Sequence, residues 1–301
     1  MDKAFADASS FSVIPAPISP WLELASPVAT LVALRAAVDS GTDCVCISYH
    51  SKSLTPLLTA HIHNGVRYAH DHGCKAILQL DTRSHGPDWR CVSGTLECAA
   101  QSGIDAILLA DASLVLYAAA RYPAIPRHYV AFDPVQDKRA IDLLRARFGI
   151  SRIVLRETPP LSAIKRLVMQ LSECANLELG IPGSTICRAI GEQREKERII
   201  VWAKDRPPSP LEQCVGNEDA ANDRCYQAPR TSNTAMLKGL PMLAAVGVHA
   251  IHIETPSRNP IELAQTVRVW RAAIDDCLDD PCRYSVRSSW INELDKVSSE
   301  S

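Results

Sequence analysis

The sequence predicts an α/β fold, specifically a single TIM-barrel-like (β/α)8 domain with a long cysteine-bearing insertion after the seventh strand. Three observations lead to this fold class. A glycine followed by a short β-branched run recurs along the chain, strands and amphipathic helices alternate through eight units, and 301 residues is a suitable length for one such barrel. An open doubly wound sheet is the alternative, but it predicts a glycine-rich phosphate turn after the first strand, where this chain has Ala25-Ser26-Pro27-Val28.

The recurring junction joins the end of a helix to the start of a strand. Glycine is favoured there because the residue after a helix often takes a left-handed conformation that lacks strain only without a Cβ. The apolar runs that follow are typical of parallel strands buried on both faces. The five junction glycines are Gly41, Gly73, Gly103, Gly149 and Gly247.

The elements follow one another as strand and helix along the chain. Strands are predicted at Trp21–Ala25, Asp43–Ser48, Lys75–Asp81, Ala106–Ala110, Arg127–Ala131, Arg152–Leu155, Leu177–Ile181 and Val248–Glu254. Helices are predicted at Thr30–Ser40, Pro56–His72, Trp89–Ser102, Ser113–Arg121, Val135–Phe148, Leu161–Ala175, Thr234–Val246 and Ile261–Leu278, with a closing helix at Ser289–Val297.

The domain organisation follows from the interruptions of this pattern. Residues 1–20 are rich in serine and proline and are predicted to be a flexible leader, and residues 21–301 form one domain. The segment at about 183–233 has no strong periodicity. Connections longer than about 15 residues are uncommon inside a compact domain and usually functional or disordered, so this insertion is the first place to look for chemistry.

Composition narrows the class of protein. With 47% hydrophobic residues, 22% charged residues and a formal net charge of -2, the chain fits a soluble domain and gives no reason to expect a nucleic-acid or membrane-surface partner. Its most apolar windows are interrupted by charges and are shorter than the roughly 20 apolar residues of a membrane span. We expect no membrane span and a cytoplasmic protein.

Charged residues that directly follow apolar strands are the catalytic candidates. In a barrel of this kind the carboxyl ends of the strands carry the active site. Arg156 and Glu157 follow the sixth strand and Glu254 ends the eighth, so we expect them at the barrel mouth, where a partly desolvated carboxylate can be tuned for proton transfer. Other polar residues at strand ends, such as Asp111, are more simply explained as loop residues that face water.

Cysteine usage points to the insertion. Eleven cysteines, an odd number, argue against a fully paired disulfide framework, and most are predicted to be structural. Cys187, Cys214 and Cys225 differ because they come from one long loop above the mouth, where thiolates can hold an iron–sulfur cluster. Such a cluster normally takes four cysteines, and this stretch supplies three.

Several motifs resemble the collagenase-like peptidase U32 family over nearly the whole chain. The matching segments are Leu22–Pro27 with Ala33–Gly41, the Arg156-Glu157 pair, Gly183-Ser184-Thr185-Ile186-Cys187, Asn222–Arg230, Ile253-Glu254 with Arg258, and Trp290–Val297. The family includes the paired proteins of oxygen-independent ubiquinone hydroxylation and enzymes that hydroxylate RNA. The resemblance therefore implies a hydroxylation role, a [4Fe–4S] cluster as cofactor and a related partner chain.

The chain departs from the family pattern at its cluster. Arg194 and Pro229 stand where two of the family's cysteines are expected, and Thr255-Pro256 replaces the Gly-Arg after the glutamate. Cys187 and Cys225 keep family positions and Cys214 is an unaligned third, so a degenerate iron–sulfur site is expected.

Three functions stay open at this point. The first is a component of oxygen-independent hydroxylation, acting on a ubiquinone-type precursor or an RNA base. The second is a peptidase of the collagenase-like type, although no Ser-His-Asp or Cys-His set can be recognised. The third is a non-catalytic partner subunit that has lost the cluster. The substrate, whether a small molecule, an RNA or a peptide, is left open.

Overall fold

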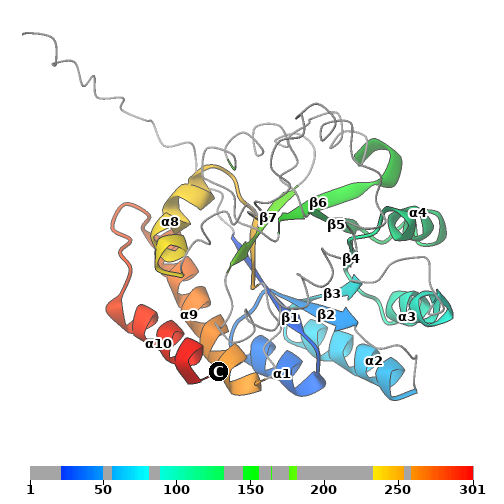
Figure 1. Ribbon diagram of the computed structural model, residues 1–301, viewed down its shortest axis with the longest axis horizontal. Coiled ribbons are helices and arrows are strands. Elements are labelled where there is room, and N and C mark those ends of the chain that lie inside the picture. The colour runs from blue at the N-terminus through cyan, green and yellow to red at the C-terminus, as the bar shows by residue number, and fades with distance from the viewer. Residues whose placement is uncertain are drawn as a thin grey trace, which may run out of the picture.

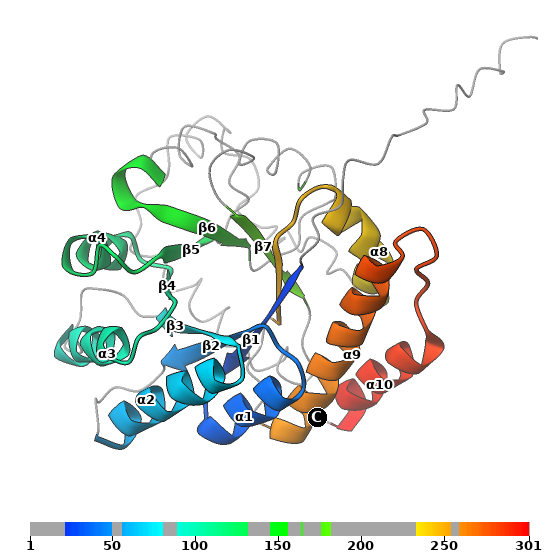
Figure 2. The same ribbon diagram turned by 180° about the vertical axis from the view of Figure 1, so that it is seen from behind.

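Eight parallel strands close into a barrel in the computed structural model. The structure describes residues 22–49, 56–80, 89–131, 145–155, 164, 176–181, 233–253 and 259–300. Each strand is hydrogen-bonded to the next in chain order, and β8 pairs with β1 to complete the ring. Helices surround the strands on the outside (Figure 1; Figure 2). The predicted (β/α)8 barrel is confirmed.

The strands overlap every predicted range. Their bounds are β1 (Glu23–Val28), β2 (Cys44–Tyr49), β3 (Lys75–Leu80), β4 (Ala106–Leu109), β5 (Arg127–Ala131), β6 (Ile150–Leu155), β7 (Asn176–Ile181) and β8 (Ala250–Ile253). The predicted leader and nearly all of the predicted insertion lie outside the described residues and stay predictions.

The end of β1 was predicted wrongly. The sequence prediction placed the strand at Trp21–Ala25, yet β1 continues through Ser26 and Pro27 to Val28. Its register with β8 runs from Glu23 to Ala25, whereas its register with β2 continues to Val28. Pro27, which has no N–H to donate, therefore lies beyond the described pairing with β8, where a proline is tolerated.

The helices also follow the predicted pattern. Their bounds are α1 (Leu31–Asp39), α2 (Pro56–Asp71), α3 (Trp89–Gln101), α4 (Ala112–Arg121), α8 (Asn233–Ala245), α9 (Pro260–Asp279) and α10 (Ser288–Glu300). The predicted helices at 135–148 and 161–175 lie mostly outside the described residues, of which 145–148 and 164 are helical. No helix in the described ranges combines the length and the apolar character that crossing a membrane requires.

All five junction glycines have the left-handed backbone that the sequence pattern predicts. Their φ angles lie between 60° at Gly149 and 95° at Gly41. Gly149 has a second constraint, because a Cβ there would lie 2.5 Å from Nη2 of Arg127. The Arg127 guanidinium in turn donates to the carbonyls of Phe148, Tyr122 and Ile125, so it holds the segments on both sides of β5 together.

The core consists of two layers separated by the strands. A small cluster fills the barrel interior and consists of Ala25, Cys44, Cys46, Ile77, Ala106, Leu108, Val130 and Val154. A larger cluster lies between the strands and the surrounding helices and includes the fully buried Trp270 of α9. Helix α9 packs against α1, α8 and α10, so a late helix of the chain lies beside the first one (Figure 1).

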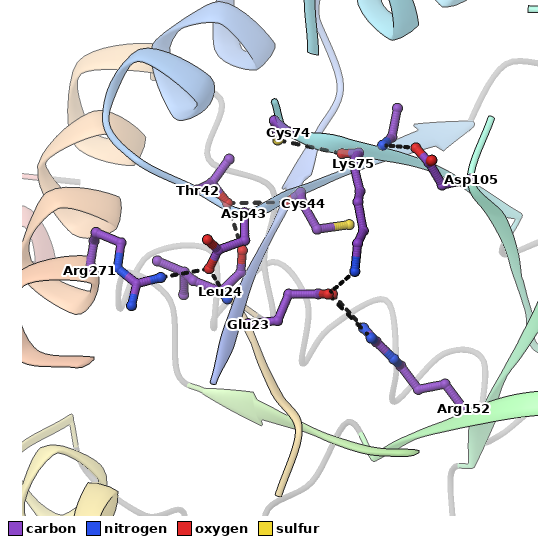
Figure 3. A network of polar contacts seen from close by, with 11 residues as sticks. Glu23, Leu24, Thr42, Asp43, Cys44, Cys74, Lys75, Asp105, Arg152 and Arg271 are labelled. Carbon is purple, nitrogen blue, oxygen red and sulfur yellow. Dashed lines mark hydrogen bonds and ion pairs between the residues drawn. The ribbon is translucent and has the colours of Figure 1, made fainter. Parts of the chain in front are cut away.

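Asp43 and Asp105 connect consecutive β/α units through hydrogen bonds (Figure 3). Each lies two residues after a junction glycine and pairs with the preceding strand. Asp43 donates its N–H to the Leu24 carbonyl at 3.0 Å and accepts the Leu24 N–H on Oδ2 at 2.8 Å. Asp105 makes the same two hydrogen bonds with Ala76, at 2.9 and 2.7 Å. Each aspartate thus satisfies both backbone groups of one strand residue, the carbonyl through its own N–H and the N–H through a side-chain oxygen.

Each of these carboxylates also takes a cationic or titratable partner from a helix. Nη1 of Arg271 in α9 lies 2.6 Å from Asp43 Oδ2, and Nε2 of His70 in α2 lies 2.9 Å from Asp105 Oδ2. Burial raises the pKa of Asp43 above its ordinary value, and the Leu24 hydrogen bond and the Arg271 charge offset only part of that effect. The same local motif thus links strands to the helices outside them.

Candidate functional site in the barrel interior

The residues predicted from sequence to carry chemistry all lie outside the described part of the chain. These are Arg156, Glu157 and Glu254 as catalytic residues, and Cys187, Cys214 and Cys225 as metal ligands. Their assignments therefore stay predictions.

The described cysteines do not supply an alternative cluster site. Seven are described, and none of them is in a disulfide: Cys44, Cys46, Cys74, Cys91, Cys98, Cys277 and Cys282. Burial raises the pKa of the Cys74 thiol to about 12 and that of Cys277 to about 11, which disfavours the thiolate that a metal binds. Within the described ranges no group of three His, Cys, Asp or Glu residues is placed to hold a metal ion.

The inward-facing positions follow from the alternation of the strands. Side chains at i and i+2 of a strand face the same side. Because Ala25, Cys46, Ile77 and Val154 belong to the interior cluster, residues two positions away from them face inward as well. Beside the apolar cluster, the described inward positions thus carry the polar residues Glu23, Lys75 and Arg152 near strand starts, His128 on β5, and Ser48, Gln79 and His252 toward the carboxyl ends.

An ion network occupies the amino end of the interior (Figure 3). Glu23 Oε1 lies 2.6 Å from Arg152 Nη1, and Glu23 Oε2 lies 3.3 Å from Arg152 Nη2 and 2.7 Å from Lys75 Nζ. The Glu23 side chain is 2% exposed and that of Arg152 is 8% exposed, whereas that of Lys75 is 55% exposed. The bidentate Arg152–Glu23 contact is therefore buried, and Lys75 links it to solvent.

The electrostatics of this network keep Glu23 ionised. Burial alone would raise the pKa of Glu23, but the hydrogen bonds and charges of Arg152 and Lys75 outweigh it and lower the pKa below its ordinary value. Beside the network, burial and the Arg152 charge lower the pKa of His249, whose carbonyl accepts the Glu23 N–H at 2.9 Å. A permanently paired carboxylate is poorly suited to proton transfer near neutral pH.

The position of the network also argues for a structural role. Glu23 and Lys75 begin β1 and β3, and Arg152 is the third residue of β6. Active sites of TIM barrels lie at the opposite, carboxyl end of the strands, and residues at the amino end usually serve stability. We therefore propose that the contacts among Glu23, Lys75 and Arg152 stabilise the amino end of the barrel interior, which we call the barrel floor.

Three hydrogen-bonding side chains face inward toward the carboxyl end, and we call Ser48, Gln79 and His252 the mouth-side set. Ser48 and Gln79 are neighbours in the β2–β3 register. His252 lies on β8 between Ala25 of β1 and Gly180 of β7, so both of its register neighbours are small residues. Gln79 and His252 are 5% and 4% exposed, and the Ser48 hydroxyl is buried without a hydrogen-bond partner among the described residues.

Sequence reasoning missed the mouth-side set because these residues lie inside apolar runs that predict buried strands. The signal that could have identified them is the alternation of inward-facing and outward-facing positions along each strand. Gln79 has the same parity as Ile77 in β3, and His252 has the same parity as Ala250 in β8. In sequence numbering the next positions of the inward series on β6 and β8 are 156 and 254, which are two of the predicted catalytic residues.

One strand-end residue has a defined structural role. Asp111 follows β4 and caps helix α4, accepting the N–H groups of Ser113 at 2.8 Å and Leu114 at 3.1 Å. This agrees with the simpler interpretation from sequence. An N-cap of this kind stabilises the helix and occupies the carboxylate.

Comparison with known proteins identifies a family whose model this chain matches. The model described as peptidase family U32 matches residues 29–193 and 203–301. The tRNA hydroxylation protein P1 of Bacillus subtilis is 23% identical over 290 residues, which cover 91% of this chain and 68% of that protein. An uncharacterized protease of Methanocaldococcus jannaschii is 24% identical over 297 residues, covering 92% and 70%.

Solved structures resemble the fold alone. An open form of tryptophan synthase from M. tuberculosis superposes with a TM-score of 0.50 and 11% identity, over 85% of this chain and 93% of that one. At this identity the likeness extends to the barrel architecture and not to the chemistry of the mouth.

Proposed function

This chain belongs to peptidase family U32, and from that premise we propose that it takes part in oxygen-independent hydroxylation of an RNA base, as one subunit of a pair. The observation that carries the proposal is the match over 91% of the chain to a relative named for tRNA hydroxylation. A ubiquinone-type precursor is the other substrate that the sequence motifs imply. The neutral hydrogen-bonding groups of the mouth-side set favour the base, because a base edge presents several donors and acceptors.

The proposed roles of the predicted residues follow from the chemistry. With water as the oxygen source, hydroxylation converts a C–H bond and H2O to C–OH and releases two protons and two electrons, which an external electron acceptor takes up. When bound, an iron–sulfur cluster passes such electrons. Cys187, Cys214 and Cys225 are its proposed ligands, in a site that is degenerate at Arg194 and Pro229. Arg156, Glu157 and Glu254 are proposed to orient the base and to hold or move a proton at the mouth.

A partner chain is part of the proposal for two reasons. The cluster ligands in this chain number three, so a fourth has to come from elsewhere. A net charge of -2 also provides no long-range attraction to RNA, which a related chain with a more basic surface would supply.

The cluster is tested by anaerobic purification followed by iron and acid-labile sulfide analysis and an absorption spectrum. We expect bound iron and sulfide in the wild-type protein and their loss in Cys187→Ala. Cys282→Ala is the matched control, because Cys282 is an exposed free cysteine outside the insertion, and it should keep its iron. A wild-type protein that binds no iron even after reconstitution would contradict the cluster.

Hydroxylation is tested separately. The chain, alone and with a related partner, is produced in a host that lacks its own U32 protein, and the nucleosides of the host tRNA are analysed by mass spectrometry. A nucleoside heavier by one oxygen atom supports the proposal, and unmodified tRNA in both cases argues against it.

A peptidase is the second candidate, because the archaeal relative carries that name. It predicts cleavage of a protein such as casein that persists in the Cys187→Ala variant. Neither cleavage nor hydroxylation would instead favour a non-catalytic partner subunit.

A further inference from the structure

The buried hydroxyl of Ser48 lacks a hydrogen-bond partner in the described structure, and it lies inside the barrel. A buried polar atom without a partner costs stability, so each instance needs an explanation. Alanine would fill nearly the same space without that cost. Residues that reduce stability in this way tend to be found where a protein meets its ligand.

The neighbours of Ser48 show what kind of ligand fits. Gln79, adjacent in register, has an amide that both donates and accepts, and the ring nitrogens of an imidazole such as that of His252 donate or accept according to the tautomer. A serine hydroxyl likewise donates and accepts. The mouth-side set therefore matches a planar group whose edge alternates donors and acceptors.

Anionic groups fit this set less well. Recognition of a phosphate or carboxylate uses cations. Among the described inward positions, the cations Lys75 and Arg152 both contact Glu23 at the opposite end of the strands. Because both cations pair with Glu23 at the barrel floor, they do not serve as anion ligands at the mouth.

We propose that Ser48, Gln79 and His252 are specificity-determining residues that hydrogen-bond the edge of the target nucleobase when it enters the barrel mouth. This inference rests on the proposed function and adds to it the side chains that select the base. The Ser48 hydroxyl gains its missing partner only when the base is bound.

The test uses the full chain, with its partner where one is needed, in the tRNA hydroxylation assay described above. Ser48→Ala should lower the hydroxylated fraction about tenfold, because a site built to hydrogen-bond its substrate discriminates strongly when that bond is lost. The same variant should melt at the wild-type temperature or a few degrees above it, since the unpaired hydroxyl has been removed. Ser48→Thr keeps the hydroxyl and should retain most of the product.

Tyr122→Phe is the matched control. The Tyr122 hydroxyl is also buried without a hydrogen-bond partner in the described part of the chain, but it lies at the end of α4, outside the barrel. Its removal should have the same small thermal effect and leave the hydroxylated fraction unchanged. Gln79→Leu and His252→Gln extend the test to the other two residues.

The possible outcomes separate the two proposals. If the wild-type protein leaves tRNA unmodified, the proposed function fails. If wild-type and Ser48→Ala proteins give equal hydroxylated fractions, the function stands and the assignment of the mouth-side set is wrong. Casein cleavage that is lost in Ser48→Ala, with tRNA unmodified, would replace the nucleobase by a peptide group as the ligand.

Discussion

At the amino end of the barrel interior, each carboxylate oxygen of Glu23 contacts a cation, whereas toward the carboxyl end the Ser48 hydroxyl has no described partner. The first region consists of opposite charges paired with one another, and the second contains a buried hydroxyl whose hydrogen-bonding capacity is unused among the described residues. A buried charge is tolerated only when it is paired, so the amino end is committed to the fold. Toward the carboxyl end, the Ser48 hydroxyl can still hydrogen-bond a ligand.

The largest effect on stability is expected from replacing Glu23, the carboxylate of the amino-end network. Glu23→Gln keeps the shape of the side chain but removes the carboxylate that pairs with the buried Arg152 guanidinium, and we expect a loss of about 3–5 kcal/mol in the free energy of unfolding. Urea denaturation measures it. Lys75→Met is the control, and because Lys75 is half exposed it should cost about 1 kcal/mol or less. A Glu23→Gln protein as stable as wild type would show that the pair does not close the barrel.

A smaller effect is expected at the aspartates that fasten the strands. Asp105→Ala removes the acceptor of the Ala76 N–H and should cost about 1–3 kcal/mol in the same assay. Asp105→Asn keeps an acceptor oxygen and loses mainly the half-exposed His70 contact, which costs about 1 kcal/mol or less. Equal losses in the two variants would assign the stabilisation to the His70 pair and not to the backbone hydrogen bond.

The smallest expected effect is a difference in acid sensitivity between Glu23 and Asp43. The pKa of Glu23 is lowered from 4.5, so its stabilisation is present above pH 4.5 and is lost as the pH falls through the folded-state pKa. The pKa of Asp43 is raised from 3.8, so its ionised form is disfavoured by folding and acid relieves that cost. Urea denaturation at about pH 6 and about pH 4 tests both directions.

Opposite changes are expected in the two variants. Glu23→Gln should lose less stability than wild type on acidification, and Asp43→Asn should lose more. The same sign in both variants would contradict the contrast between the two carboxylates.

Much of the fold could be predicted because its signals are local. A glycine after a helix, followed by an apolar run, identified each junction, and the structure gives all five of these glycines a positive φ. The prediction failed at the end of β1, which it placed at Ala25 although the strand continues through Pro27 to Val28. Whether a proline fits a strand depends on which neighbour it would have to hydrogen-bond, and that is a property of the sheet and not of the segment.

The interior polar residues were harder to predict for the same reason. Glu23 and Arg152 are separated by 129 residues, and no local pattern indicates that they meet. Gln79 and His252 are single polar residues within apolar strands, where parity alone distinguishes an inward side chain from an outward one. The catalytic and cysteine assignments, by contrast, came from residues at strand ends and in the insertion, and they stay predictions.

Asp43 joins contacts of very different range. Its hydrogen bonds to Leu24 span 19 residues, whereas its ion pair with Arg271 spans 228. During synthesis on the ribosome, the first two β/α units can therefore dock long before residue 271 has emerged. We expect the amide of Leu24 to gain protection from hydrogen exchange early. The barrel should close only after α9 has been synthesised and Arg271 can pair with the Asp43 carboxylate.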